Sequence, residues 1–200
     1  MKRITTLICA ALLFAACNNA QDQQNTPAAP EQQATEQSQV TEKSPEQLLN
    51  DAISNYLVKE IGSQYAQGDV CIPALTLVAT EDQDAEQMRV WGDFWIFNYK
   101  LAGDTLKTVS GGNHSGCITL VRANNDSPMT VTSFEQTVDG AGNVASTKRI
   151  FGQYYDKFQK VQSDQAAREA ARKAQLKEYV GQHGLNARYY QDYGREAVAL

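Results

Sequence analysis

The sequence predicts an α+β domain, an antiparallel β-sheet of about five strands packed with an N-terminal helix and two C-terminal helices. Three observations within residues 44–200 lead to this prediction. Apolar residues recur every three to four positions at the start, at every second position in the middle, and every three to four positions again near the end. Helices grouped on either side of a run of closely linked strands are typical of α+β proteins.

The first helix is predicted from residue 45 to about residue 61. Ser44, Pro45 and Gln47 form a capping box with proline at the first helical position, a combination that favours a helix start. Gly62 is placed to end the helix. One face of the helix is apolar, because these residues recur at three- and four-residue spacing: Leu49, Ile53, Tyr56, Leu57 and Ile61.

Alternation with a period of two follows and predicts an antiparallel meander. The connections between strands are short and include a glycine-rich turn after residue 111. Both faces of the strand at 89–101 are apolar at its centre, which is typical of a central strand with at least one face against helices. We expect strands at residues 71–80, 89–101, 105–111, 117–123 and 129–138.

Helical spacing returns after Ser146 and predicts two more helices. Asp164 caps the second of these, which runs over about residues 164–180, is rich in alanine and stops at Gly181. The tyrosine-rich tail at 186–200 either adds an edge strand or lies across the sheet. The apolar face of the first of the two helices comprises Ile150, Phe151, Tyr154, Phe158 and Val161.

A long helix followed by a meander over residues 45–138 resembles the cystatin-like and nuclear-transport-factor-like rolls in the order of its elements. No motif accompanies this resemblance, and the two later helices depart from the cystatin pattern. No functional residue is therefore carried over to this chain.

The first seventeen residues have the pattern of a targeting segment. Lys2 and Arg3 precede a mostly apolar, uncharged run at 4–16, which has the length of a signal peptide and is too short for a membrane-spanning helix. The residues before and including Cys17 resemble the lipobox of bacterial lipoprotein precursors: Leu13, Phe14, Ala15, Ala16 and Cys17.

The lipobox resemblance implies that residues 1–16 are a lipoprotein signal peptide and that Cys17 is lipidated. Its sulfur would carry diacylglycerol and its new amine an acyl chain such as palmitate, which together give the two or more alkyl chains that stable anchoring requires. Asn18, where retention signals have Asp, favours the outer membrane of a Gram-negative bacterium. The alternative is an ordinary secretory signal cleaved near Ala16, with a free cysteine.

Residues 17–43 are predicted to be a disordered tether, and residues 44–200 a single globular domain. The tether has no aromatic residue, one branched aliphatic residue and seven glutamines, so it cannot bury enough apolar surface to fold. Loss of Lys2 and Arg3 with the signal takes the net charge from −5 to −7. That charge excludes a general nucleic-acid binder.

Aromatic residues on the central strand are the first candidate ligand site. Trp95, Phe97 and Tyr99 share one face of the strand, and aromatic surface in a concave wall binds apolar or sugar rings well. The same side chains also fit a packed core.

His114 is the second candidate and lies in the glycine-rich segment 111–117. It is either a general base, alone or paired with Cys117, or a solvated histidine in a bulged hairpin turn. Cys71 and Cys117 are the cysteines left once Cys9 is removed and Cys17 is lipidated. In an oxidising compartment they either form a disulfide or remain as two buried free thiols.

We predict no cofactor and no bound metal. The chain has two histidines and no CxxC spacing, and the acidic segment 81–86 lacks the glycine of a calcium loop, which favours a solvated turn. Charge is uneven, with −8 over residues 44–145 and +4 over residues 146–200. A solvated helix face that complements the acidic half, or alternatively a partner contact, is predicted for Arg168, Arg172, Lys173 and Lys177.

These features predict a lipid-anchored cell-envelope protein whose domain is a non-catalytic binding or interaction module, in the periplasm or at the outer surface. Its expected partners are the membrane, through Cys17, and an envelope protein or small ligand. One alternative is an envelope hydrolase that uses His114 with a carboxylate. The other is an envelope scaffold that contacts proteins through its charged halves.

Overall fold

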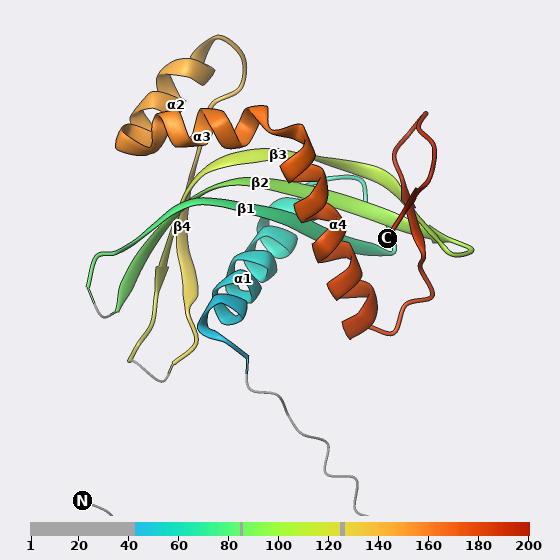
Figure 1. Cartoon of the computed structure of the whole chain (residues 1–200). Coiled ribbons are helices and arrows are strands. Elements are labelled where there is room, and N and C mark those ends of the chain that lie inside the picture. Colours follow the sequence, from blue (N-terminus) through green and yellow to red (C-terminus); the bar gives the residue numbers. More distant parts are fainter. Residues whose placement is uncertain (1–42, 85, 125–126) are drawn as a thin grey trace, which may run out of the picture. The chain divides into compact units, whose positions relative to one another are not determined.

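The computed structural model describes residues 43–84, 86–124 and 127–200. They form the predicted α+β domain, in which a curled sheet of six strands carries helices on both faces (Figure 1). The strand order is β1-β2-β3-β5-β6, and β4 also pairs with β3. The strands are β1 (Val70–Asp82), β2 (Gln87–Ala102), β3 (Thr105–Val121), β4 (Thr130–Gln136), β5 (Tyr189–Gln191) and β6 (Val198–Ala199).

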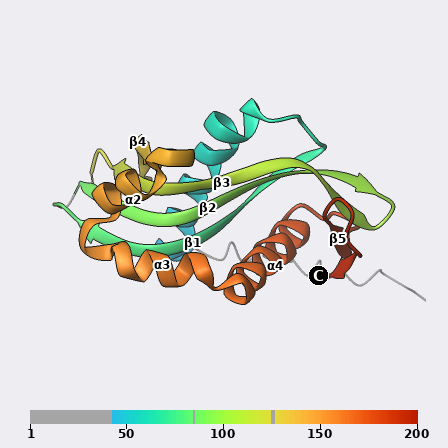
Figure 2. The same ribbon diagram turned by 90° about the horizontal axis from the view of Figure 1, so that it is seen from above.

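Helices lie on the two faces of the sheet. α1 lies under the curve of the sheet, and α3 and α4 follow one another along β1 on the other face (Figures 1 and 2). The capping box at Ser44 and Gln47 starts α1 as the sequence predicts. The helical segments are α1 (Pro45–Tyr56), η1 (Leu57–Ile61), η2 (Gly62–Gln64), η3 (Gly140–Gly142), α2 (Asn143–Phe151), η4 (Gly152–Tyr154), α3 (Tyr155–Ser163) and α4 (Gln165–Gln182).

β2 is the central strand; the sequence predicts helices on at least one of its faces, and helices pack against both. Phe94 and Ile96 point toward α1, where they pack with Leu57. On the other face Trp91 packs against α2 and α3, and Tyr99 packs against α4. Since side chains alternate along a strand, the odd-numbered residues from Trp91 to Tyr99 all face the C-terminal helices.

β1 is an edge strand of the sheet, and α4 protects it. The Leu75 backbone N–H donates to Gln175 Oε1 at 2.9 Å, and Gln175 Nε2 donates to the Leu75 carbonyl at 3.1 Å. One glutamine amide thus makes the two hydrogen bonds that a neighbouring strand would make. Pro73 lies two residues before Leu75 on β1, where the backbone amide would again face away from β2. Proline has no N–H to donate there. Together they block pairing with a strand from another chain.

The predicted glycine-rich turn between residues 111 and 117 is wrong, because β3 runs through it without interruption. The glycines provide room for packed neighbours instead of a reversal of the chain. A Cβ on Gly112 would collide with the Tyr65 hydroxyl, and a Cβ on Gly116 would lie 2.9 Å from the Phe134 ring. The irregularity that the glycines suggested is present nearby, as a bulge in β3 opposite Asn98 and Tyr99.

The C-terminal part follows the prediction with one correction. The helix expected from Ile150 to Val161 is broken at Gly152, whose φ of 48° separates α2 from α3. Asp164 caps α4 through its side chain, which accepts from the Ala167 N–H, as expected. In the tail, β5 pairs parallel with the start of β3, so the edge-strand alternative is the one observed.

Cys71 and Cys117 are free thiols, so the disulfide alternative does not hold in the structure. The register explains why: Cys71 pairs with Asn98 of β2 and Cys117 with Trp91, which lie seven residues apart on that strand. Seven residues of strand span about 23 Å, far beyond the reach of a disulfide. Burial raises the pKa of Cys71 to about 11 and also raises that of Cys117, so both thiols are protonated at neutral pH.

In the described part of the chain, no helix has the length and apolar character that crossing a membrane requires. The predicted signal peptide, Cys17 and nearly all of the tether lie outside the described residues.

Candidate functional site

The candidate site is a pocket of about 190 Å³ between α4 and the face of β2 that carries Trp95, which we call the α4 pocket. Trp95 and Phe97 form its floor. Residues of α4 form one wall, and the tail contributes Asp192. The pocket therefore joins the central strand, where the sequence placed a ligand site, to segments about seventy residues or more further along the chain.

Two stacked aromatic rings form the floor. The ring centroids of Trp95 and Phe97 are 5.8 Å apart and the ring planes differ by 10°. Ala74 of β1 lies opposite Trp95, and its small side chain leaves the ring half-buried, in contrast to a closed core. Half-buried aromatic surface beside polar groups is the usual make-up of a small-molecule site.

A buried aspartate holds Trp95 in place. Asp93 is 0% exposed, and its carboxylate accepts hydrogen bonds from Trp95 Nε1 at 3.0 Å, Asn113 Nδ2 at 2.6 Å and Ser115 Oγ at 2.7 Å. Three donors satisfy a charge that would otherwise be costly to bury. The indole plane of Trp95 is therefore fixed before any ligand arrives.

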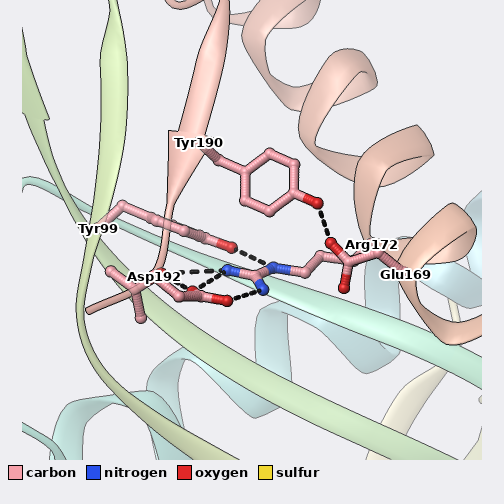
Figure 3. A network of polar contacts seen from close by, with 6 residues as sticks. Tyr99, Glu169, Arg172, Tyr190 and Asp192 are labelled. Atoms are coloured by element: carbon pink, nitrogen blue, oxygen red, sulfur yellow. Dashed lines mark hydrogen bonds and ion pairs between the residues drawn. The ribbon is translucent and has the colours of Figure 1, made fainter. Parts of the chain in front are cut away.

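Arg172 is the centre of a second network, shown in Figure 3. Its side chain is only 5% exposed and makes a two-pronged contact with Asp192, from Nη1 to Oδ2 at 2.9 Å and from Nη2 to Oδ1 at 2.8 Å. Its Nε donates to the Tyr99 hydroxyl at 2.9 Å, and Nη2 also donates to Thr108 Oγ1 at 3.1 Å. Every nitrogen of this guanidinium has an acceptor within the protein, so Arg172 holds the structure together and is not available to a ligand.

Aromatic rings surround the same guanidinium. Its carbon lies 3.8 Å from the ring centroid of Phe97 and 4.7 Å from that of Tyr190. The Tyr190 hydroxyl donates to Glu169 of α4. Cation–π contacts and a paired carboxylate together lower the cost of burying the charge.

These contacts determine the charge states of Arg172 and Asp192. The hydrogen bonds from Arg172 hold the pKa of Asp192 below its ordinary value, against the opposing effect of partial burial. Burial opposes the charge on Arg172, but the bonds to Asp192 and Tyr99 outweigh it and raise the pKa of the guanidinium. Both groups are charged at neutral pH.

Among the described residues that line the pocket, Arg168, one turn before Arg172 on α4, is the cation without a paired acid. Its guanidinium carbon lies 5.6 Å from the ring centroid of Trp95. Within the described residues its side chain makes no ion pair and no hydrogen bond. A half-buried arginine above an aromatic ring, with all its donors unused, is placed to meet an anionic group.

His114 lies elsewhere, on the opposite face of the sheet. Its Nε2 is 2.8 Å from the Tyr65 hydroxyl, and its Nδ1 is 2.7 Å from Gln136 Oε1. Both partners are neutral, and no carboxylate contacts the ring in the described part of the chain. Cys117 faces the C-terminal helices, so no Cys/His pair forms. From its position on β3, His114 links Tyr65, directly after η2, to Gln136 of β4.

The acidic segment behaves as the predicted turn. Asp84 Oδ1 accepts from the backbone N–H groups of Glu86 and Gln87, both at 2.8 Å, and Glu81 accepts from Tyr154. Among the described residues there is no group of three or more His, Cys, Asp or Glu side chains placed to hold a metal ion.

Trp95, Phe97 and Tyr99 are brought together as predicted, and His114 is not among them. Tyr99 is 0% exposed and serves as a support under Arg172. The sequence does not predict Arg172 and Asp192 as site residues, because the basic residues of the last helix favour a solvated face and Asp192 comes from the separate C-terminal tail. The signal was present: Arg172 lies four residues before the buried Leu176 on the face of α4 that meets the sheet.

Comparisons with known proteins found no family model, no curated protein and no solved structure that matches the chain significantly.

Proposed function

We propose that this chain is a lipid-anchored cell-envelope protein whose folded domain binds a small ligand in the α4 pocket without catalysing a reaction. The observation that carries the proposal is the half-buried, stacked pair of Trp95 and Phe97 with the unpaired Arg168 above Trp95. Asp93 and Arg172 fix the surrounding side chains through their own hydrogen bonds. Such preorganisation favours binding, because little side-chain entropy remains to be lost.

The chemistry of the pocket selects a planar ring that carries a carboxylate. The ring would stack on Trp95, and the carboxylate would accept hydrogen bonds from Arg168. The volume of about 190 Å³ is below the range of about 300–1,000 Å³ that drug-sized ligands occupy. A ligand with a single ring fits this size.

Single-ring carboxylates are expected to shift the indole N–H NMR signal of Trp95 in a saturable way, while the matched ring amides and amines do not. Arg168→Gln should weaken this binding about tenfold, the amount that loss of a charge-assisted hydrogen bond costs. Lys177→Gln, an exposed position on the same helix, is the control and should leave binding unchanged. The absence of a response to every ring carboxylate, or equal binding by Arg168→Gln, would contradict the proposed site.

The anchor is proposed from the sequence at Cys17, and its test is independent of the pocket. In cells labelled with palmitate, Cys17→Ser should lose the label and leave the membrane fraction, since no other residue would carry acyl chains. Cys9→Ser, which alters a cysteine within the signal peptide, should keep both. Membrane fractionation and palmitate labelling of the Cys17→Ser protein would rule out the anchor.

A further inference from the structure

A larger concavity lies further along β1, beginning at Leu77 directly after Thr76 of the α4 pocket, and we call it the α1 groove. It has a volume of about 1090 Å³ and opens between the start of α1, the second half of β1, the chain after β3, and α3. It shares no lining residue with the α4 pocket. A ligand in one site would therefore not occupy the other.

Leucine and methionine side chains form the wall of the groove. Leu48 and Leu49 come from α1, Leu77 from β1, Met88 from β2, and Met129 from the segment before β4. Leu48 is 50% exposed although it lies on the first turn of a helix beside the core. Methionine adapts its shape to flexible apolar partners. This wall suits an alkyl chain better than a rigid ring.

Two cations stand beside the apolar wall. Arg122, just after β3, and Lys157, on α3, both line the groove, and among the described residues Glu46 is the one acid in its lining. The Nε of Arg122 is buried without a hydrogen-bond partner, and neither cation forms an ion pair within the described residues. A buried donor without an acceptor is costly in a native protein. Since the Arg122 side chain lines the groove and makes no hydrogen bond or ion pair within the described residues, its guanidinium can donate to an anionic group there.

We infer that the α1 groove binds a single acyl chain with an anionic headgroup. The tail lies along the leucine and methionine wall, and a carboxylate or phosphate oxygen accepts from Arg122, with Lys157 adding to the positive potential. Burying the tail provides the affinity, and the cation selects the charge of the headgroup.

The experiment uses the full chain carrying Cys17→Ser, so that its own proposed acyl groups cannot compete. Decanoate, dodecanoate and dodecyl phosphate are titrated below their micellar concentrations, with dodecylammonium and dodecanol as probes of matched chain length. The methyl NMR signals of Met88 and Met129 report on the groove. We expect saturable shifts with the anions and a gain of about fourfold in affinity for each added methylene.

Arg122→Gln should weaken dodecanoate binding about tenfold and leave dodecanol binding unchanged. Lys100→Gln, an exposed cation at the far end of β2, is the control and should change neither. Leu48→Glu gives a second test at a half-exposed position that should not affect folding, and it should weaken both ligands.

Tighter binding of dodecanoate than of dodecyl phosphate would identify a fatty acid as the source of the ligand, and the reverse order would identify a lipid phosphate. Three outcomes would each overturn the inference. Dodecylammonium could bind as tightly as the anions, the Met88 and Met129 signals could stay unchanged on titration, or both the Arg122→Gln and Leu48→Glu variants could keep wild-type affinity.

Discussion

Asp192→Ala is expected to lower the free energy of unfolding by about 2–3 kcal/mol at neutral pH. The substitution leaves the guanidinium of Arg172, which is 5% exposed, without its counter-charge. Removing one member of a buried ion pair costs about 3–5 kcal/mol. Because the Asp192 side chain is 42% exposed and water can enter in its place, we expect a loss below or at the lower end of that range.

Arg172→Met should cost less, about 1 kcal/mol. The methionine side chain keeps apolar contact with Phe97 and Tyr190, and Asp192 retains its bond from the Thr108 hydroxyl at 2.6 Å. Urea unfolding of the two variants measures the difference. Asp156→Ala, an exposed carboxylate on α3, is the control and should be neutral. If Arg172→Met costs as much as Asp192→Ala, the buried charge is not what makes the pair important.

The pH dependence gives a second check on the pair. The pKa of Asp192 is lower in the folded than in the unfolded chain, because Arg172 donates to it. The stability that this provides is present above the unfolded pKa of about 4 and is lost as pH falls through the folded value. The stability difference between wild type and Asp192→Ala should therefore be constant from neutral pH down to about pH 5 and narrow below about pH 4.

The elements of this fold that the sequence predicts well are those set by neighbouring residues. The capping box at Ser44 acts within four residues, and its two hydrogen bonds are present in the structure. The apolar run at the centre of β2 follows from the burial of both of its faces. The prediction of a turn at the β3 glycines is wrong because the space beside them is taken by residues distant in sequence: Tyr65 at Gly112, and Phe134 with the β4 backbone at Gly116.

The site, like the fold, is predictable from the sequence only where neighbouring residues determine it. That Trp95, Phe97 and Tyr99 share a face follows from strand alternation alone, and the structure has it so. Strand alternation does not predict which side chains lie opposite these three rings, because that depends on how α4 and the tail pack against the sheet. The alanine-rich sequence of α4 is typical of a solvated helix. In the structure, however, α4 packs with Arg172 over the Phe97 ring, and Asp192 of the tail binds Arg172.

Gly116→Ala is expected to cost about 3 kcal/mol, the upper part of the range for overpacking a core. An added Cβ would collide with the Glu135 carbonyl oxygen, and it would lie 2.9 Å from the Phe134 ring and 3.0 Å from Gln136 Cα. Two of these neighbours are backbone atoms of β4, which a change of rotamer cannot move. Relief requires β4 to shift away from β3, and the edge contact of Phe94 with Phe134, at 5.6 Å between centroids, would weaken.

Gly181→Ala is the matched control, since nothing lies within 4 Å of the position on α4 where its Cβ would be. That substitution should stabilise the protein by about 0.5 kcal/mol, because alanine favours a helix over glycine. Urea unfolding gives both values, and NMR signals of the Phe134 ring report whether β4 has moved. If neither substitution lowers the free energy of unfolding, β4 can move away from β3 at little cost, and packing does not explain the glycine at position 116. If only Gly116→Ala destabilises and the Phe134 signals shift, Gly116 is what allows β4 and its Phe134 ring to pack closely against β3.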